Sequence, residues 1–493
     1  MQKIHKKQNP TATLFSSKSL ISILLTCCMI LSSPALIMAA APKTTTAIDP
    51  LMPSLETKKL SAAEITIKKN LEKYLSFLEL KKGFSGQILV ANNNKVLIHK
   101  AYGLADKEAK ISNTIETTFA MGSITKQFTA TAVLQLVEQN KIKLDEPISK
   151  YLDKVPFGDK ITVHQLLTHT SGLFDFTEAA IPKYLSEGSI HMSYNDFIAM
   201  IKDKPLNFEP GTQFKYSNTG YYLLGALVEK VSGEALPLYF DKHLIKPAQM
   251  TATSFAYDGL TKKVKATGYM VTGDKDEVDK ILLNIAGGAG ALSTTVADLY
   301  HWNNALYTGK LISANSLSQM TGQDKNMKLL APYAYGLMID HKLYGNSSFH
   351  GGNTLGFTAE NAYFPDKNAQ IIILTNKGYA DLNSIKANIV SIFNGKMPEL
   401  KENKTVELTP AQIDQFVGDY EIPGILKIKI FRDKNKLLFQ GENQPAITLE
   451  AASDKEFFTE QFGGISIHFD QTENPTGFLL KQAGISLQAQ KIK

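Results

Sequence analysis

A serine and a lysine three residues apart are the first pair in this sequence that could do chemistry. Ser123 and Lys126 lie in the stretch FAMGSITK, at the start of an apolar helical pattern over residues 124–140. That spacing brings two side chains to one face of a helix. A buried amine with a lowered pKa can take the proton of a serine hydroxyl, and free N–H groups at a helix N-terminus can hold an oxyanion. In a lysine-rich chain, however, S-x-x-K alone indicates a helix cap followed by a surface lysine.

The second segment of interest is Tyr-Ser-Asn at residues 216–218. It follows a Pro-Gly turn at 210–211 and precedes a helical pattern, so its side chains can point into a cleft. The phenol of Tyr216 could relay a proton to a leaving group, and the amide of Asn218 could fix the lysine and the substrate. Taken alone, this segment indicates an ordinary aromatic residue and a helix cap.

The third segment is His350-Gly351-Gly352-Asn353, which we place after a short strand and before Phe357. Two glycines let a substrate backbone lie close to the chain, and the N–H of Asn353 could donate to an oxyanion. A glycine turn beside a histidine would also be the simpler interpretation if this segment stood alone.

In this order the three segments resemble the serine β-lactamase and penicillin-binding-protein superfamily, whose signature includes S-x-x-K. The Tyr-x-Asn form is that of class C β-lactamases, DD-carboxypeptidases, D-aminopeptidases and β-lactamase-like esterases. Residues 161–173 and 287–294 are also similar to family segments, and the resemblance covers about residues 86–376. It implies an α/β fold, with an antiparallel sheet flanked by helices and a cleft between the sheet and an all-helical part.

The resemblance also implies a role for each residue. Ser123 would be the acylated nucleophile and Lys126 its proton acceptor, while Tyr216 would act as a base or as an acid toward the leaving group. Asn218 would orient the lysine and the substrate amide. The N–H groups of Ser123 and Asn353 would form the oxyanion hole. Whether Lys126 or Tyr216 is the general base stays open, because coupled groups share their protons.

One departure from the family pattern concerns substrate binding. Asn218, Gly351, Gly352 and Asn353 match the expected binding residues, but His350 stands where lysine is usual. A histidine with a pKa of about 6.5 is largely neutral at pH 7, unlike lysine. Some DD-peptidases and aminopeptidases of the family share this histidine. We therefore expect activity, but not strong β-lactam hydrolysis.

Other candidate sites are weaker. His164 and His169 are five residues apart, which does not bring them together on a helix face, and we interpret both as structural. The sequence has no H-E-x-x-H motif and no cysteine ligand set, so we expect no metal and no cofactor. Near the C-terminus, Phe457, Phe458 and Phe462 are interpreted as core or interface residues.

The N-terminus predicts export to the periplasm or the medium. A basic start, an apolar run over 20–31 and small residues near Ala40 are typical of a cleaved signal peptide over residues 1–40. A membrane anchor is the weaker alternative because the run is shorter than about 20 residues. Cys27 and Cys28 are the only cysteines, so cleavage would leave no thiol. Lipoprotein anchoring is not expected because the preceding Leu25 and Thr26 fit poorly.

After residue 40, the rest of the 493-residue chain divides into three predicted parts. These are a linker over 41–60, a hydrolase domain over 61–396, and an all-β domain over 397–493. The hydrolase domain should begin with a helix after Ser61, whose apolar positions are Ile65, Leu71, Tyr74, Leu75 and Leu78. A hairpin over 84–91 and 95–102, strands at 335–340, 356–364 and 371–375, and a helix opened by the capping pair Thr295 and Asp298 complete the sheet layer.

The sequence of the all-β domain predicts a helix at 410–416, followed by a small barrel or sandwich of seven short strands. Its expected strands are 425–431, 436–440, 447–451, 457–460, 465–469, 477–482 and 485–491. It resembles the lipocalin-like domains that follow some of these hydrolases.

The charge distribution argues against a nucleic-acid partner. The formal net charge is +6, but four lysines lie in the first forty residues, which leaves 6 − 4 = +2 for the rest. Arg432 is the only arginine. The expected partner is therefore a small-molecule or peptide substrate, and the oligomeric state stays open.

Together these features predict an exported serine hydrolase that acts through an acyl-enzyme on D-amino-acid peptides or on small amides and esters. A β-lactamase-like carboxylesterase is one alternative. A catalytically silent protein that binds cell-wall peptides is another.

Overall fold

The computed structural model describes residues 59–181, 192–255, 265–270, 285–323, 329–341, 345–354, 356–378, 380–400, 404–442, 446–459, 464–482 and 485–492. The predicted signal peptide, and the predicted linker up to residue 58, lie outside these residues.

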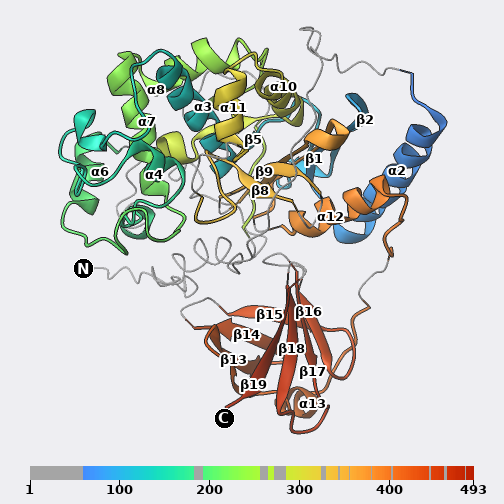
Figure 1. The fold of residues 1–493 in the computed structure, drawn as a ribbon. Coiled ribbons are helices and arrows are strands. Elements are labelled where there is room, and N and C mark those ends of the chain that lie inside the picture. The colour runs from blue at the N-terminus through green and yellow to red at the C-terminus, as the bar shows by residue number, and fades with distance from the viewer. Residues whose placement is uncertain are drawn as a thin grey trace, which may run out of the picture.

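A six-stranded antiparallel sheet forms the centre of the N-terminal part, with strand order β2-β1-β11-β10-β9-β8. Its strands are β1 (Gly86–Asn92), β2 (Lys95–Tyr102), β8 (Met338–Asp340), β9 (Ser347–Asn353), β10 (Thr358–Phe364) and β11 (Ala369–Thr375). β1 and β11, the first and last strands of this sheet along the chain, are paired with each other (Figure 1). The helices from α3 to α11 are inserted between β2 and β8 in the sequence. The predicted α/β class with an antiparallel sheet is confirmed.

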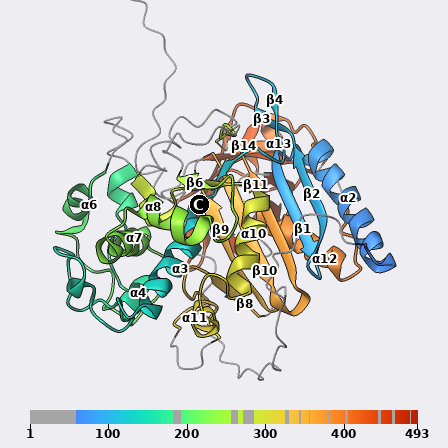
Figure 2. The same cartoon turned by 90° about the horizontal axis from the view of Figure 1, so that it is seen from above.

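Both faces of this sheet are covered. On β1, Ile88 and Val90 point toward helices α2 (Ala62–Lys82) and α12 (Leu382–Phe393), whereas Leu89 joins the core beneath α10 (Val296–Tyr307). Figures 1 and 2 show α2 and α12 on one side of the sheet and α10 on the other. Burial of both faces explains why the central strands are almost continuously apolar.

The first helix and the first hairpin follow the sequence signals. The Ser61 side chain accepts from the N–H of Glu64, and the Glu64 carboxylate accepts from the N–H of Ser61, which is a complete capping box. Ile65, expected on the buried face, is instead 56% exposed. Between β1 and β2, Asn93 and Asn94 have φ values of 50° and 58°, as a two-residue hairpin turn requires.

The helical part lies beside the sheet and surrounds helix α3 (Thr125–Glu138), which is buried on nearly all sides. The 3₁₀ turn η1 (Gly122–Ile124) precedes α3, so Ser123 lies on a tight turn and not inside the predicted helix. Figure 2 shows α3 between α7 and the sheet. The other helices and 3₁₀ or π turns of this layer are η2 (Ile148–Lys150), α4 (Val163–Leu167), α6 (Tyr194–Ile201), α7 (Asn218–Ser232), α8 (Leu236–Phe240), η3 (Asp241–Ile245), η4 (Gly287–Ala289) and α11 (Ala314–Met320).

Short strands and one further turn complete this part of the chain. They are β3 (Leu104–Asp106) with β4 (Ile111–Ser112), β5 (Phe119–Ala120) with β7 (Leu292–Thr294) and β6 (Ser254–Phe255), and η5 (Pro365–Lys367).

The predicted capping pair of α10 is only half formed. The Thr295 side chain accepts from the N–H of Asp298. The Asp298 carboxylate turns away and accepts from the N–H groups of Thr251 and Ala252 and from the hydroxyl of Thr253. Asp298 therefore ties a distant loop to the start of α10, a contact that the local sequence does not encode.

The C-terminal part is a closed eight-stranded antiparallel barrel. Helix α13 (Pro410–Asp414) precedes strands β12 (Gly418–Ile422), β13 (Leu426–Asp433), β14 (Lys436–Gly441), β15 (Ile447–Ala451), β16 (Glu456–Thr459), β17 (Ile465–Phe469), β18 (Gly477–Gln482) and β19 (Ile485–Lys491). The sequence predicted seven of these strands and missed β12, in which Tyr420 and Ile422 are the buried positions. Phe457 lies in the barrel core as expected, Phe458 is half-buried, and Phe462 lies outside the described residues.

Candidate active site

The structure brings Ser123 and Lys126 together at the start of α3. Lys126 Nζ lies 3.0 Å from Ser123 Oγ. The lysine is completely buried, whereas the serine is half-buried and can be reached from outside. A nucleophile must be accessible and its proton acceptor protected from water, and this pair has that arrangement.

The other contacts of Lys126 determine what its nitrogen can offer to the serine. Nζ donates to Asn218 Oδ1 at 2.9 Å and to the carbonyl oxygen of Ala289 at 2.8 Å. Both of these oxygens can only accept hydrogen bonds, and a neutral amine has two N–H groups and one lone pair. If both N–H groups are used there, the lone pair of the neutral amine faces Ser123 Oγ.

The Tyr216 side chain lies directly beside this pair. Its ring centroid is 4.8 Å from Lys126 Nζ, and the residue is half-buried in the loop before α7. Asn218 is the first residue of α7, so the backbone turn at 216–218 directs both side chains toward the lysine. The first and second segments therefore meet in space.

The third segment lies within β9 and not after a strand, which corrects the prediction from the sequence. The end of β9 packs tightly on the turn that carries Ser123. A Cβ on Gly352 would lie 1.9 Å from the carbonyl oxygen of Met121, and one on Gly122 would lie 3.0 Å from Asn353 N. Position 352 therefore requires glycine, because the backbone of β9 contacts the backbone of residue 121 there. The chain segments that carry the N–H groups of Ser123 and Asn353 lie side by side.

His350 lies in the same strand, β9, and is buried. Its Nε2 lies 3.0 Å from the Tyr333 hydroxyl and its Nδ1 lies 2.5 Å from the carbonyl oxygen of Gly351. Burial, aided by the charge of Lys126, lowers the pKa of His350 to about 3. The ring is therefore neutral at pH 7, and the geometry disfavours an imidazolium that holds a substrate carboxylate.

Three further residues of the site were missed by the sequence interpretation. His169, expected to be only structural, lies with its ring centroid 4.2 Å from that of Tyr216. Asp175 accepts hydrogen bonds from Asn218, and Tyr333 reaches both His350 and His169. Similarity of residues 161–173 to the family was the available signal for His169. No local signal indicated Tyr333.

The remaining sequence candidates lie elsewhere or form no site. His164 Nδ1 is 2.8 Å from the Tyr335 hydroxyl. Within the described ranges, no group of three or more His, Cys, Asp or Glu side chains could hold a metal ion.

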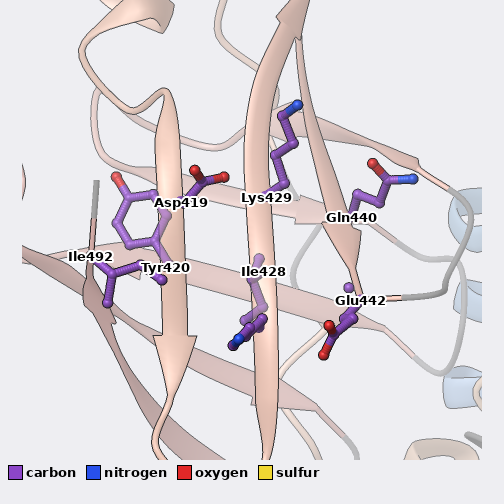
Figure 3. Close-up of a pocket in the computed structure, with 9 residues that line it drawn as sticks. Asp419, Tyr420, Ile428, Lys429, Gln440, Glu442 and Ile492 are labelled. Carbon is purple, nitrogen blue, oxygen red and sulfur yellow. The ribbon is translucent and has the colours of Figure 1, made fainter.

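A separate pocket of about 420 Å³ lies on the barrel, over β12, β13 and β14 (Figure 3). Its lining mixes acids with lysines, among them Asp419, Lys427, Lys429 and Glu442. None of the residues that line this pocket belongs to the segments at 123–126, 216–218 and 350–353.

Residues 79–392 match the family model described as Beta-lactamase. PbpX of Bacillus subtilis (strain 168), which is named as a penicillin-binding protein, is 30% identical over 341 residues, covering 69% of this chain and 82% of that protein.

Two solved structures extend this comparison. An octameric penicillin-binding protein homologue from Pyrococcus abyssi is 25% identical with a TM-score of 0.59, covering 86% of this chain and 100% of its own. A D-stereospecific amidohydrolase from Streptomyces is 26% identical with a TM-score of 0.55, covering 68% of this chain and 99% of its own. Within the described part of the chain, every helix is too short or too polar to span a bilayer.

Proposed function

Because the chain belongs to the beta-lactamase family, we propose that it is a serine hydrolase that forms an acyl-enzyme on Ser123. The observation that carries this proposal is the environment of Lys126 Nζ, which meets the Ser123 hydroxyl and two oxygens that only accept hydrogen bonds. A neutral Lys126 in this position has its lone pair directed at the proton that the serine must lose.

The reaction then proceeds in two stages. The Ser123 proton passes to Lys126 while Oγ attacks the substrate carbonyl carbon, and the resulting oxyanion accepts hydrogen bonds from the N–H groups of Ser123 and Asn353. The bond to the leaving group breaks as that group takes a proton, a role that we assign to Tyr216, whose ring centroid is 4.8 Å from Lys126 Nζ. Lys126 then passes the proton that it took from Ser123 to Tyr216, so both groups return to their starting states. Water then attacks the ester, releases the acid and returns a proton to Ser123.

The substrates we propose are peptides or amides of D-amino acids. Support comes from the name of the Streptomyces relative, a D-stereospecific amidohydrolase. The neutral His350 gives no fixed cation for the carboxylate of a β-lactam, which supports an amidase over a β-lactamase. We also propose that the protein is exported by the signal peptide over 1–40, with the hydrolase domain over 61–396 and the barrel domain over 397–493.

Covalent labelling tests the proposal. A fluorophosphonate should modify wild-type protein at Ser123, identified by peptide mass spectrometry, and Ser123→Ala should abolish the label. Modification at another residue, or none, contradicts the assignment. A panel of a cephalosporin, an acyl-D-Ala-D-Ala peptide, a D-amino-acid amide and a nitrophenyl ester then identifies the substrate. Turnover of the ester alone indicates an esterase, and acylation without release indicates a binding protein.

A further inference from the structure

The chain between residues 166 and 176 forms a bend that packs along the Tyr216–Asn218 segment. Backbone hydrogen bonds join the two, since the N–H of Lys215 donates to the carbonyl oxygen of His169 at 3.0 Å. The Tyr221 hydroxyl donates to the carbonyl oxygen of Leu167 at 2.8 Å. Two side chains of this bend, His169 and Asp175, reach the residues that surround Lys126.

His169 holds the tyrosine of the site. Its ring lies against that of Tyr216 at a centroid separation of 4.2 Å and an angle of 36°. Its Nδ1 accepts the N–H of Ser217 at 3.1 Å, so the proton of the neutral ring is on Nε2. His169 is 1% exposed and has a φ of 57°, an uncommon backbone conformation for a residue other than glycine. The fold therefore fixes both the place and the direction of this ring.

The neutral state of His169 suits that position. Burial, aided by the charge of Lys126, lowers the pKa of His169 well below the usual 6.5. A neutral ring keeps Nδ1 as an acceptor for the Ser217 N–H. It also adds no positive charge close to a lysine that must shed its own proton.

Asp175 holds the amide of the site. Its Oδ2 accepts from the backbone N–H of Asn218 at 2.8 Å and from Asn218 Nδ2 at 3.3 Å. Its Oδ1 accepts from the N–H and the hydroxyl of Thr177. With the Asn218 NH₂ group drawn to the carboxylate, the amide oxygen must point to Lys126, because a flipped amide would turn its NH₂ toward the lysine and its oxygen toward the carboxylate.

We propose that His169 and Asp175 are positioning residues for the acylation of Ser123. His169 sets the Tyr216 ring, and Asp175 sets the amide of Asn218 that receives a hydrogen bond from Lys126. This inference rests on the proposed function, because it assigns both residues a part in the same reaction.

Two variants separate the contacts of His169. His169→Asn keeps an acceptor near the position of Nδ1 and tolerates a positive φ, whereas His169→Phe keeps a ring but loses the acceptor. We expect His169→Phe to lower the rate constant of fluorophosphonate acylation on the order of 10²-fold and His169→Asn by less than about 10-fold. A control, His301→Phe, replaces a half-buried histidine of α10 and should leave acylation unchanged.

Asp175 is tested by the same measurement. Asp175→Ala should slow acylation on the order of 10-fold or more, and Asp175→Asn, which keeps one acceptor oxygen, should restore most of the rate. Rescue by the conservative variants is the readout that a purely structural role would not give. Circular dichroism and the melting temperature show which variants are folded. If His169→Phe does not fold, the Asp175 pair carries the test.

The outcomes separate this inference from the proposed function. Absence of wild-type labelling at Ser123 contradicts the function, and crystal structures of the variants then still report whether Tyr216 and Asn218 have moved. Wild-type labelling with unchanged rates in folded His169→Phe and Asp175→Ala overturns the inference. Equal losses in the conservative and disruptive variants also overturn it.

Discussion

Among the residues that the structure describes, two lysines are buried, on opposite sides of the antiparallel sheet, and their partners differ. Lys386, on α12, is 1% exposed and donates to Glu360 Oε1 at 2.5 Å, with its nitrogen 3.9 Å from the centroid of the Phe349 ring. Lys126, on α3, is equally buried but meets three neutral oxygens, those of Ser123, Asn218 and Ala289.

This contrast shows that burial alone does not assign a lysine to catalysis. Lys386 contacts a carboxylate and an aromatic face, and its hydrogen bond to Glu360 ties α12 to β10. Lys126 Nζ contacts neutral oxygens, which supports the proton-acceptor role that we propose for it. We therefore expect the two lysines to affect different measurements when they are replaced.

The largest effect is expected on the reaction, from Lys126→Met. Loss of the proton acceptor should reduce the rate constant of Ser123 acylation on the order of 10² to 10⁴-fold. Stopped-flow labelling with a nitrophenyl ester measures it. The melting temperature should fall little, since methionine fills a similar volume. Acylation within a factor of ten of wild type would assign the base to Tyr216.

The next effect is expected on stability, from Lys386→Met. This change leaves the Glu360 carboxylate buried without its lysine, which should lower the free energy of unfolding by about 3–5 kcal/mol. Chemical denaturation measures the loss. Acylation per folded molecule should match wild type, because the pair lies on the face of the sheet away from Ser123. A loss of acylation rate without a loss of stability would contradict the contrast.

Replacing both partners sharpens the same comparison with a smaller change. In Lys386→Met with Glu360→Leu, no buried charge is left unpaired, so the free energy of unfolding should return to within about 2 kcal/mol of wild type. Because the partners touch, the effects of the single changes should not add. A double variant as unstable as the sum of the single variants would show that packing, and not charge, sets the cost.

The local parts of this fold were predictable because their signals are local. Ser61 with Glu64 encodes the start of α2, and Asn93-Asn94 encodes the first hairpin. The S-x-x-K spacing likewise predicted that Ser123 and Lys126 meet, which needs one helical turn. In each case the residues that interact are neighbours in the sequence.

The parts that failed depend on distant contacts. Asp298 matches a capping pattern but is taken by the loop at 251–253. In strand β12, buried apolar residues alternate with polar ones, and Tyr420 packs into a core that later strands complete. His169 was interpreted as structural from its spacing to His164, and its contact with Tyr216, 47 positions later in the sequence, depends on the tertiary fold. Tertiary packing decides such cases, and a single sequence does not show it.

The last effect concerns another buried basic group, His350, and it is measured from pH dependence. Its pKa is about 3 in the folded protein and about 6.5 when unfolded. Between these values the unfolded chain binds a proton that the folded chain does not. Stability should therefore fall as the pH is lowered through this window, by about 1.4 kcal/mol per pH unit for this histidine.

His350→Gln keeps an acceptor near the position of Nε2 for the Tyr333 hydroxyl and should flatten the dependence of unfolding free energy on pH between about 4 and 6, whereas the same change at exposed His341 should not. In the wild type, KM for an acidic substrate should stay level from about pH 5 to 8, because His350 carries no charge there to lose. A KM that rises with pH near 6.5 for the acidic substrate, but not for a neutral ester, would mean that His350 is an imidazolium facing the cleft. The cation that holds the substrate would then be this histidine.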